Sequence, residues 1–319
     1  MKRVLVTGAC GYLGARLSKY LAENKFSVTA FDNFNPSNYT EWFSMMDEVI
    51  IGDICDETVI DNLCKKRFDI VIHLISLDHH KSEQNPNFVS SINVMPTWNL
   101  LDKLSKRGLE KFIYFSTVQV YGSNKKSFIS EETNPSPSNV YGLTHLMSEQ
   151  ICNFYSNKTD TYCINVRLSN SFGSPIFKEN NCWWLVINDL CKTSFSKEYI
   201  KLFSDGSAQK DFIHVNDICS SIKCLINNPS TDKNCYHIAT GQTYSILNIA
   251  YKIKKVYQIE FGKDIDIFYQ DGSKVKKDQN YFDEEDHQFS TTNINNIGFK
   301  PKYTIELGIK EIFKYLKVS

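Results

Sequence analysis

Residues 7–14 have the sequence Thr7-Gly8-Ala9-Cys10-Gly11-Tyr12-Leu13-Gly14, which lies between an apolar run, Val4–Thr7, and a predicted helix over residues 12–24. Glycines here permit a tight turn, a close approach of the main chain to a pyrophosphate, and close packing of the helix on the strand. The anion then lies at the helix N-terminus, where free N–H groups and the helix dipole favour negative charge. The stretch therefore predicts a dinucleotide-binding turn.

The second predicted strand, Ser27–Phe31, is followed by Asp32 and Asn33. A carboxylate at this point can accept hydrogen bonds from both hydroxyls of an adenine ribose, and it would repel the extra phosphate of NADP. No arginine stands beside Asp32 to offset that repulsion. The sequence therefore favours NAD over NADP, although Asp32-Asn33 is also a good turn sequence.

Short apolar segments alternate with helical patterns through the first half of the chain. Buried strands are expected at Val4–Thr7, Ser27–Phe31, Glu48–Ile51, Ile70–Leu74, Phe112–Ser116 and Tyr162–Val166. Helices are expected near 12–24, 56–66, 86–107 and 139–157. This alternation predicts an α/β fold with a doubly wound parallel sheet of the Rossmann type.

The pattern changes after residues 172–175. Helices are expected near 181–195, 216–228, 246–258 and 304–318, with strands near 199–203, 211–215 and 234–238. The charged segment Asp271–Gln288 is expected to be a loop or flap. We therefore expect an NAD-binding Rossmann domain over 1–170 and a smaller α+β domain over 171–319. The smaller domain would mainly bind substrate, some of its segments would return to the first domain, and the cleft between the domains is the expected site.

The composition excludes several classes of protein. Thirty-six basic and 36 acidic residues cancel, so no overall field draws the chain to nucleic acid or to an anionic membrane. No apolar run is long enough to cross a bilayer or to form the core of a signal peptide. The ten cysteines form no C-x-x-C pair and no tight Cys/His cluster, so we expect a cytoplasmic protein without a metal site.

Further motifs follow the glycine-rich turn in a fixed order. They are Gly52-Asp53-Ile54, Val71-Ile72-His73-Leu74-Ile75-Ser76, Asn93-Val94-Met95-Pro96-Thr97-Trp98-Asn99-Leu100-Leu101, Ser116-Thr117-Val118-Gln119-Val120-Tyr121-Gly122, Tyr141-Gly142-Leu143-Thr144-His145, Arg167-Leu168-Ser169-Asn170, Lys210-Asp211-Phe212-Ile213-His214-Val215-Asn216-Asp217 and Gly298-Phe299-Lys300-Pro301. Together they resemble the extended short-chain dehydrogenase/reductase family, specifically its nucleotide-sugar epimerases and dehydratases. The resemblance covers nearly the whole chain, from Lys2 to about Tyr315.

The resemblance implies an NAD-dependent enzyme and a set of cofactor-binding residues. These are Gly8, Gly11, Tyr12, Leu13, Gly14, Asp32, Asn33, Asp53, Ile54, Leu74, Ile75, Ser76, Asn93, Tyr141 and His145. Asn93 matches a structural asparagine of the family, and Asp53-Ile54 matches its adenine-contacting segment.

The resemblance also implies the catalytic residues. Tyr141 would be the base that takes a proton from a sugar hydroxyl, and Thr117 would hydrogen-bond the same oxygen. A free phenol has a pKa of about 10, so a base active near neutrality needs a shift of roughly three units, or about four kcal/mol. The family's lysine supplies this field four residues after the tyrosine, but here that position holds His145, which carries only part of a charge near pH 7.

The substrate implied by the resemblance is a nucleoside-diphosphate sugar, held by Thr117, Asn170 and Lys210. Family members usually grip the diphosphate with arginines, yet no arginine follows Arg167 in this chain. Lysine lacks the bidentate fork of arginine, so binding is expected to be looser and more sensitive to salt. Lysines 274, 276 and 277 could assist, although at least two of them are better explained as a solvated loop face.

Oxidation of the C4 hydroxyl to a 4-keto sugar is the reaction that these residues favour. The 4,6-dehydratases of the family place an acid and a base after the catalytic threonine, where this chain has Val118 and Gln119, so dehydration is disfavoured. A 4-epimerase and a 4-dehydrogenase both stay open. A non-catalytic, NAD-responsive regulator on the same fold is the alternative, because fold alone does not establish function.

Two predicted helices, 86–107 and 139–157, carry apolar residues on more than one face. Examples are Trp98 in the first and Leu143 in the second. One face of each helix covers the sheet, so the rest needs another partner. We therefore expect a homodimer, and the resemblance implies a four-helix interface.

Overall fold

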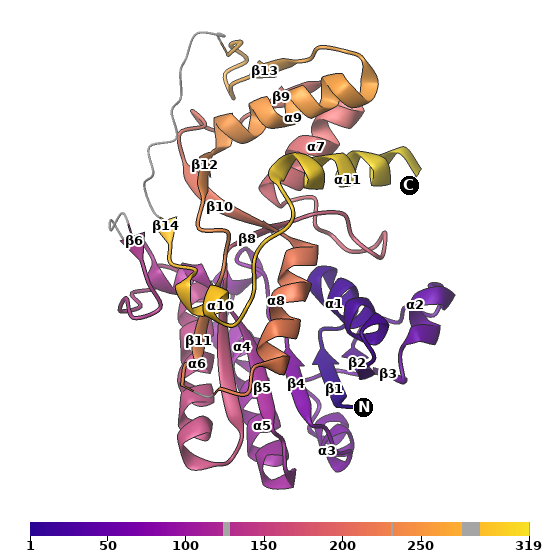
Figure 1. Cartoon of the computed structure of the whole chain (residues 1–319), viewed down its shortest axis with the longest axis vertical. Helices are drawn as coiled ribbons and strands as arrows, with labels where there is room; N and C mark the ends of the chain where they lie inside the picture. Colours follow the sequence, from indigo (N-terminus) through magenta and orange to yellow (C-terminus); the bar gives the residue numbers. More distant parts are fainter. Residues whose placement is uncertain (124–127, 231, 276–287, 319) are drawn as a thin grey trace.

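The computed structural model of this protein describes residues 1–123, 128–230, 232–275 and 288–318. At its centre lies a parallel sheet of seven strands in the order β11-β7-β5-β4-β1-β2-β3 (Figure 1). Its strands are β1 (Arg3–Thr7), β2 (Ser27–Asp32), β3 (Glu48–Ile51), β4 (Ile70–His73), β5 (Lys111–Thr117), β7 (Tyr162–Leu168) and β11 (Cys235–Ile238). The expected Rossmann-type α/β fold is confirmed.

Helices cover both faces of this sheet, because successive side chains of a buried strand point to opposite sides. Val4 and Val6 of β1 pack in one apolar cluster with residues of α1 and α8, whereas Leu5 packs in another with residues of α3, α5 and α6. These helices and their neighbours are α1 (Tyr12–Glu23), α2 (Thr40–Met45), α3 (Glu57–Lys65), α4 (Pro86–Asn93), α5 (Met95–Leu104), α6 (Val140–Lys158), α8 (Val215–Asn227) and α10 (Thr292–Asn296).

A second, smaller unit stands beyond the carboxyl ends of the strands (Figure 1). It has its own apolar core, to which α7, α9 and α11 contribute. Its elements are β8 (Asn170–Phe172), α7 (Val186–Lys197), β9 (Tyr199–Lys201), β10 (Gln209–His214), β12 (Thr243–Ser245), α9 (Ile246–Phe261), β13 (Asp266–Phe268) and α11 (Ile305–Val318). A short pair, β6 (Phe128–Ile129) with β14 (Gln288–Phe289), and the 3-10 helices η1 (Lys81–Glu83), η2 (Ser105–Arg107) and η3 (Val118–Tyr121) complete the fold.

Two of the predicted helices differ clearly from their expected bounds. The predicted helix 86–107 is broken after Asn93, because Pro96 has no N–H to donate and its ring disfavours a continuous helix there. The helix expected from residue 181 begins only at Val186. The strand expected near 234–238 pairs with β7 in the large sheet, so a segment from beyond residue 170 completes the first unit.

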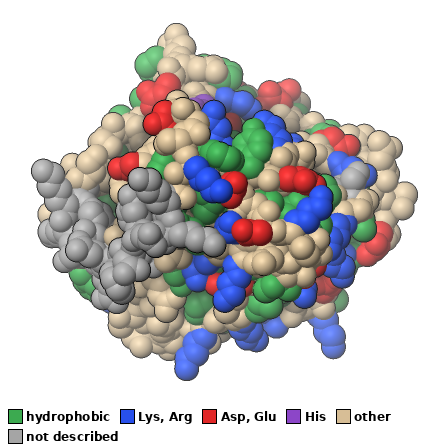
Figure 2. All heavy atoms as spheres, turned by 90° about the horizontal axis from the view of Figure 1, so that it is seen from above, with side chains coloured by type: hydrophobic (Ala, Val, Ile, Leu, Met, Phe, Trp, Pro, Cys, Tyr) green, Lys and Arg blue, Asp and Glu red, His purple; other side chains and the backbone are tan. Residues whose placement is uncertain are grey.

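Acidic and basic side chains alternate over the face that carries α9 and β13 (Figure 2). This mixture agrees with the balanced charge of the chain. Within the described residues, no helix is both long and apolar enough to cross a membrane.

The strands bring the predicted site residues to one edge. Thr7 pairs with His73, His73 with Tyr114, and Thr117 with Leu168, so the carboxyl ends of β1, β4, β5 and β7 lie side by side. The order of the strands reverses between β1 and β4, and crevices at such a point are where open α/β sheets bind ligands.

Candidate active site

The glycine-rich turn has the geometry that a pyrophosphate requires. Gly8 has φ +74°, and the N–H of Gly11 donates to the Gly8 carbonyl at 3.1 Å. A Cβ on Gly14 would stand 1.9 Å from that carbonyl oxygen, so only glycine lets α1 pack this closely. No side chain caps the N-terminus of α1, which leaves its first N–H groups for an anion.

Asp32 lies at the end of β2, next to this turn. One of its carboxylate oxygens accepts a hydrogen bond from the Cys10 N–H at 2.8 Å, and the other accepts one from the Phe34 N–H at 3.0 Å. The carboxylate thus orders the turn, and each of its oxygens retains a further lone pair that could accept a hydrogen bond from a ligand hydroxyl. Asn33 follows directly.

The other expected cofactor residues line or support the same edge. Asp53 is exposed and Ile54 is buried just after β3, while Leu74, Ile75 and Ser76 follow β4. Asn93 is fully buried, and its amide is used by the protein: it accepts from the Leu77 N–H at 2.7 Å and donates to the Thr144 hydroxyl at 3.0 Å. Asn93 therefore holds the strand-end loop against α6, as the structural asparagine of the motif implies.

Tyr141, at the start of α6, points its hydroxyl toward Ser76 and Thr117. Burial, together with the carboxylate of Asp78, raises the pKa of the Tyr141 phenol to about 12. Hydrogen bonds with Ser76 and Thr117 lower it and are outweighed. The sequence motif predicted the pairing of Tyr141 with Thr117; the contribution of Asp78 was not foreseen.

His145 lies one helical turn further along α6, edge-on to Tyr141, with ring centroids 4.4 Å apart. Its Nδ1 is 2.8 Å from the Tyr114 hydroxyl, and its Nε2 is buried without a hydrogen-bond partner among the described residues. Burial lowers the pKa of His145 to about 4, so the ring is uncharged near pH 7 rather than partly charged. A buried ring nitrogen without a partner is one that a hydroxyl donor can satisfy.

A buried polar network lies beneath the end of β5, the strand that carries Thr117. Glu149 of α6 accepts hydrogen bonds from Ser116 at 2.5 Å and from two nitrogens of Arg167, at 3.0 and 2.7 Å. Arg167 also donates to the Tyr121 hydroxyl at 2.7 Å. Because Ser116 directly precedes Thr117, its hydrogen bond to the Glu149–Arg167 ion pair holds the end of β5 in place.

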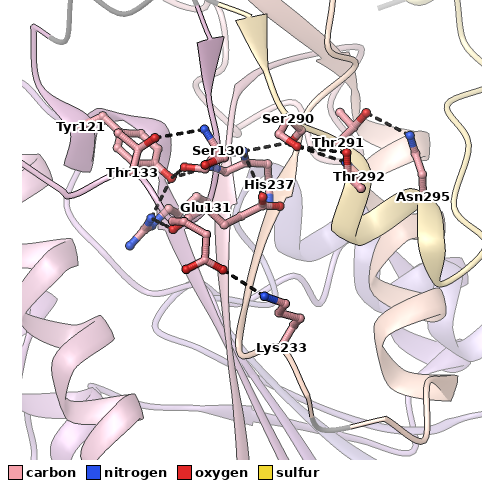
Figure 3. Close-up of polar contacts among 12 residues, drawn as sticks. Tyr121, Ser130, Glu131, Thr133, Lys233, His237, Ser290, Thr291, Thr292 and Asn295 are labelled. Carbon is pink, nitrogen blue, oxygen red and sulfur yellow. Dashed lines mark hydrogen bonds and ion pairs between the residues drawn. The ribbon is translucent and has the colours of Figure 1, made fainter.

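The network continues to the strand β14, as Figure 3 shows. Tyr121 and His237 point toward one another, with the hydroxyl 2.6 Å from Nε2, and Nδ1 of His237 is 3.0 Å from the Ser290 carbonyl oxygen. A carbonyl only accepts, so Nδ1 carries the proton and Nε2 accepts from Tyr121. Burial keeps this ring neutral by lowering the pKa of His237 to about 4.

A cleft of about 510 Å³ opens above Thr117 and Tyr141, between the two units. Asn170 and Lys210, the two further substrate residues expected from the sequence, both line it. The Asn170 amide donates to the Asp211 carbonyl at 2.9 Å, while Lys210 is exposed. Lys274 instead forms an ion pair with Asp266 at 2.8 Å, and Lys276 and Lys277 lie outside the described residues.

Several cleft residues were missed from the sequence. They are Asp78, His79 and His80, on the loop after β4, and Trp184, just before α7. Polar residues directly after a parallel strand were a usable signal, because strand ends meet at the ligand-binding edge. Within the described ranges, no group of three or more His, Cys, Asp or Glu side chains is placed to hold a metal ion.

Comparison with known proteins places this site in a family. The model of the NAD dependent epimerase/dehydratase family matches residues 4–246. The chain belongs to this family. Membership confirms the resemblance seen in the sequence, the enzyme class and the NAD cofactor. The family model ends at residue 246, within the smaller unit.

Relatives in the epimerase/dehydratase family match along most of the chain. A dTDP-L-rhamnose 4-epimerase of Burkholderia thailandensis is 23% identical over 98% of this chain and 94% of its own length. A UDP-glucose 4-epimerase of Oryza sativa is 28% identical over 83% of this chain and 71% of its own.

Solved structures show the same fold. A UDP-glucose 4-epimerase of Thermotoga maritima, solved with UDP-glucose, has a TM-score of 0.83 at 23% identity and covers 99% of this chain and 98% of its own. A UDP-glucuronic acid 4-epimerase of Bacillus cereus, solved with a fluorinated substrate analogue and NAD, has a TM-score of 0.80 at 20% identity, with 99% of each chain covered.

Proposed function

We propose that this protein oxidises the C4 hydroxyl of a nucleoside-diphosphate sugar to a 4-keto sugar, as a 4-epimerase or a 4-dehydrogenase. The observation that carries the proposal is the convergence of Tyr141, Thr117 and Ser76 at the floor of the cleft. A hydroxyl held there would have a hydrogen-bond partner in Thr117 and a proton acceptor in Tyr141. Relatives that act on dTDP- and UDP-sugars support this substrate class.

The residues of the chain divide the work as follows. Gly8, Gly11 and Gly14 with the start of α1 would hold the pyrophosphate of NAD, Asp32 would hold its adenine ribose, and His145 would contact the other ribose. When bound, NAD accepts the hydride. Thr117 orients the sugar oxygen, and the oxygen of Tyr141 takes the proton from it. Because the resting phenol is protonated, deprotonation of Tyr141 limits oxidation at neutral pH.

Val118 and Gln119 support the exclusion of a 4,6-dehydratase. Both line the cleft beside Thr117, and neither side chain can act as an acid or base. The Gln119 amide oxygen moreover accepts a hydrogen bond from Asn139 at 2.9 Å. In an epimerase the keto sugar rotates within the site and receives the hydride on its other face. In a dehydrogenase the keto sugar leaves and the cofactor stays reduced.

The proposal is tested by the absorbance of the reduced cofactor at 340 nm. Protein loaded with NAD would be mixed with UDP-, dTDP-, GDP- and ADP-sugars in turn. An absorbance increase with at least one sugar is expected. Conversion to the C4 epimer, followed by chromatography, identifies an epimerase, whereas accumulation of keto sugar and reduced cofactor identifies a dehydrogenase.

A second candidate is an NAD-responsive regulator without turnover. The neutral His145 favours it, because the site then lacks the fixed cation that would ionise Tyr141. Protein that binds NAD and nucleotide sugar, yet gives neither an absorbance change nor a C4 epimer with any sugar, would support this alternative.

We also propose a cytoplasmic homodimer. Phe88, Met95 and Trp98 on α4 and α5, and Leu143, Met147 and Phe154 on α6, are each between 44 and 53% exposed. Large apolar side chains exposed on adjoining helices are costly in water and suit a second copy of the chain. All ten cysteines are free, which suits a reducing compartment.

A further inference from the structure

Two histidines form part of the cleft rim, on the loop that follows β4. The rings of His79 and His80 have centroids 3.9 Å apart, and the His79 ring is 5.5 Å from that of Trp184, across the cleft. His79 and Lys210 both line the cleft above Tyr141 and also a second chamber of about 440 Å³ beside it. These two side chains therefore stand at the junction of the two spaces.

Positive charge gathers at this junction. Burial and the positive charges of His80 and Lys210 lower the pKa of His79, and Asp78 opposes them. No carboxylate within the described residues forms an ion pair with Lys210. The neighbouring Asp211 carboxylate is buried and accepts hydrogen bonds from Ser169 and Thr240 instead.

The start of α7 adds main-chain N–H donors to the wall of the cleft. Leu185 and Val186, at the start of the 12-residue helix α7, line the cleft, and no side chain caps this helix end. Donors on three separate elements suit a group with several anionic oxygens. A diphosphate meets this description better than a single carboxylate does.

Lys210 is already the residue that the family resemblance assigns to the substrate. We propose that His79 joins it in binding the diphosphate, and that His79 takes up a proton as the diphosphate binds. The inference rests on the proposed function, which supplies a substrate with a diphosphate. An anion beside an imidazole favours its protonated form, so the bound state holds a proton that the free state lacks at neutral pH. His79 thus supplies a second cation in a chain that has no arginine after Arg167.

Other titratable groups around His79 do not account for such an uptake. Asp78 and His80 lie on its own loop, and Lys210 lies on β10. Of the remaining cleft residues, burial raises the pKa of Tyr141 to about 12 and that of Cys182 to about 11, so both stay protonated. His80 carries the neighbouring imidazole on the same loop, and it serves as the matched control.

The test is the binding of nucleotide sugars at two pH values by isothermal titration calorimetry. The protein carries NAD and the substitution Tyr141→Phe, so that binding is measured without turnover. UDP-glucose, dTDP-glucose, GDP-mannose and ADP-glucose serve as probes, because their phosphates do not titrate between pH 6 and 8. We expect the dissociation constant of the tightest probe to rise about tenfold from pH 6 to pH 8, since a coupling of one pKa unit equals tenfold in affinity. Buffers of different ionisation enthalpy should report proton uptake.

Substitutions assign the effect to one residue. His79→Gln should remove the pH dependence and leave affinity near the pH 8 value, whereas His80→Gln should retain the dependence. An equal dissociation constant at both pH values, or a full pH dependence in His79→Gln, would overturn the inference. A pH dependence found with UDP-glucuronic acid alone would assign the site to the sugar carboxylate and overturn it too. If no probe binds at all, the proposed substrate class is wrong as well. Binding without pH dependence refutes the role of His79 alone, so the two failures are distinguishable.

Discussion

The imidazole of His145 lies edge-on against the phenol of Tyr141, with ring centroids 4.4 Å apart on the same face of α6. The spacing of four residues places both rings at the cofactor edge. In this position a lysine would supply a permanent charge, whereas the buried imidazole is neutral above a pH of about 4. The chemistry of the site is therefore expected to depend strongly on pH.

Replacing His145 by lysine should shift the pH profile of oxidation. The rate requires the Tyr141 phenolate, and because the pKa of Tyr141 is raised to about 12, the wild-type rate should still be rising at pH 10. A cation one turn away favours the ionised phenol, so His145→Lys should move the rising limb to lower pH by about one unit, or about 1.4 kcal/mol. The measurement is the rate of NAD reduction between pH 6 and 10.

Two controls accompany this comparison. His145→Ala should move the rising limb of the oxidation rate to higher pH or weaken NAD binding, because the proposed ribose contact is lost. Tyr114→Phe removes the hydroxyl that contacts His145 at 2.8 Å and separates loss of that contact from the change in charge. Superimposable profiles with unchanged NAD affinity would show that His145 takes no part in the chemistry.

Asp32 should set the preference for NAD over NADP. We expect wild-type protein to bind NAD at least tenfold more tightly, because the carboxylate repels a 2′-phosphate. Asp32→Asn keeps a side-chain oxygen to accept from the Cys10 N–H, as Asp32 does at 2.8 Å. Because the substitution removes the negative charge, it should narrow the difference in affinity between NAD and NADP. Affinities of the apoprotein for both cofactors decide the matter, and comparable wild-type affinities would refute the role of Asp32.

The apolar face on α5 and α6 should hold two copies of the chain together. Trp98→Glu combined with Leu143→Glu would place charges in the proposed interface and should give a monomer, because both side chains are 48% exposed in the single chain. Phe203→Glu, at a residue 68% exposed on the smaller unit, is the control and should stay dimeric. Light scattering at micromolar concentration measures the mass; a wild-type monomer would contradict the proposal.

Three buried histidines should make the fold sensitive to acid. Burial lowers the pKa of His73 to about 3 and those of His145 and His237 to about 4, whereas an unfolded histidine titrates near 6.5. Between these values the unfolded chain binds more protons, so stability falls as the pH decreases, by up to about 4 kcal/mol per pH unit for the three together.

Urea unfolding at pH 7, 6 and 5 measures this dependence. His237→Gln removes one titrating group and should reduce the slope by about a third. Phe128→Ala, at a residue 55% exposed, changes no titrating group and serves as the control. A free energy of unfolding that is constant from pH 7 to 5 would refute the explanation.

Periodicity and motif spacing predicted the parallel sheet and the places of Gly8, Asp32, Thr117 and Tyr141. These features are local, since Gly8, Asp32 and Thr117 lie at or just after the end of a strand and Tyr141 lies at the start of a helix. The position of Asp78 and His79 directly after β4 was a usable signal for the cleft, but their closeness to Tyr141 and Lys210 could not be predicted, because it depends on how the loop after β4 lies against segments far along the chain. The neutral state of His145 likewise follows from burial by distant elements, which the sequence around α6 does not record.

Transfer of a labelled hydride tests the central claim most directly. Nucleotide sugars carrying deuterium at C4 would be mixed with an equal amount of NAD-loaded protein, the mixture quenched in acid-free denaturant, and the cofactor analysed by mass spectrometry. With at least one sugar, wild-type protein should yield deuterated reduced cofactor. Tyr141→Phe should lower this yield at least a hundredfold while binding NAD normally, because the substitution removes the base and keeps the ring. Tyr155→Phe, on the same helix and hydrogen-bonded to Asp102 away from the cleft, should behave as wild type. Absence of label with every sugar, or label within tenfold of wild type in Tyr141→Phe, would contradict the account.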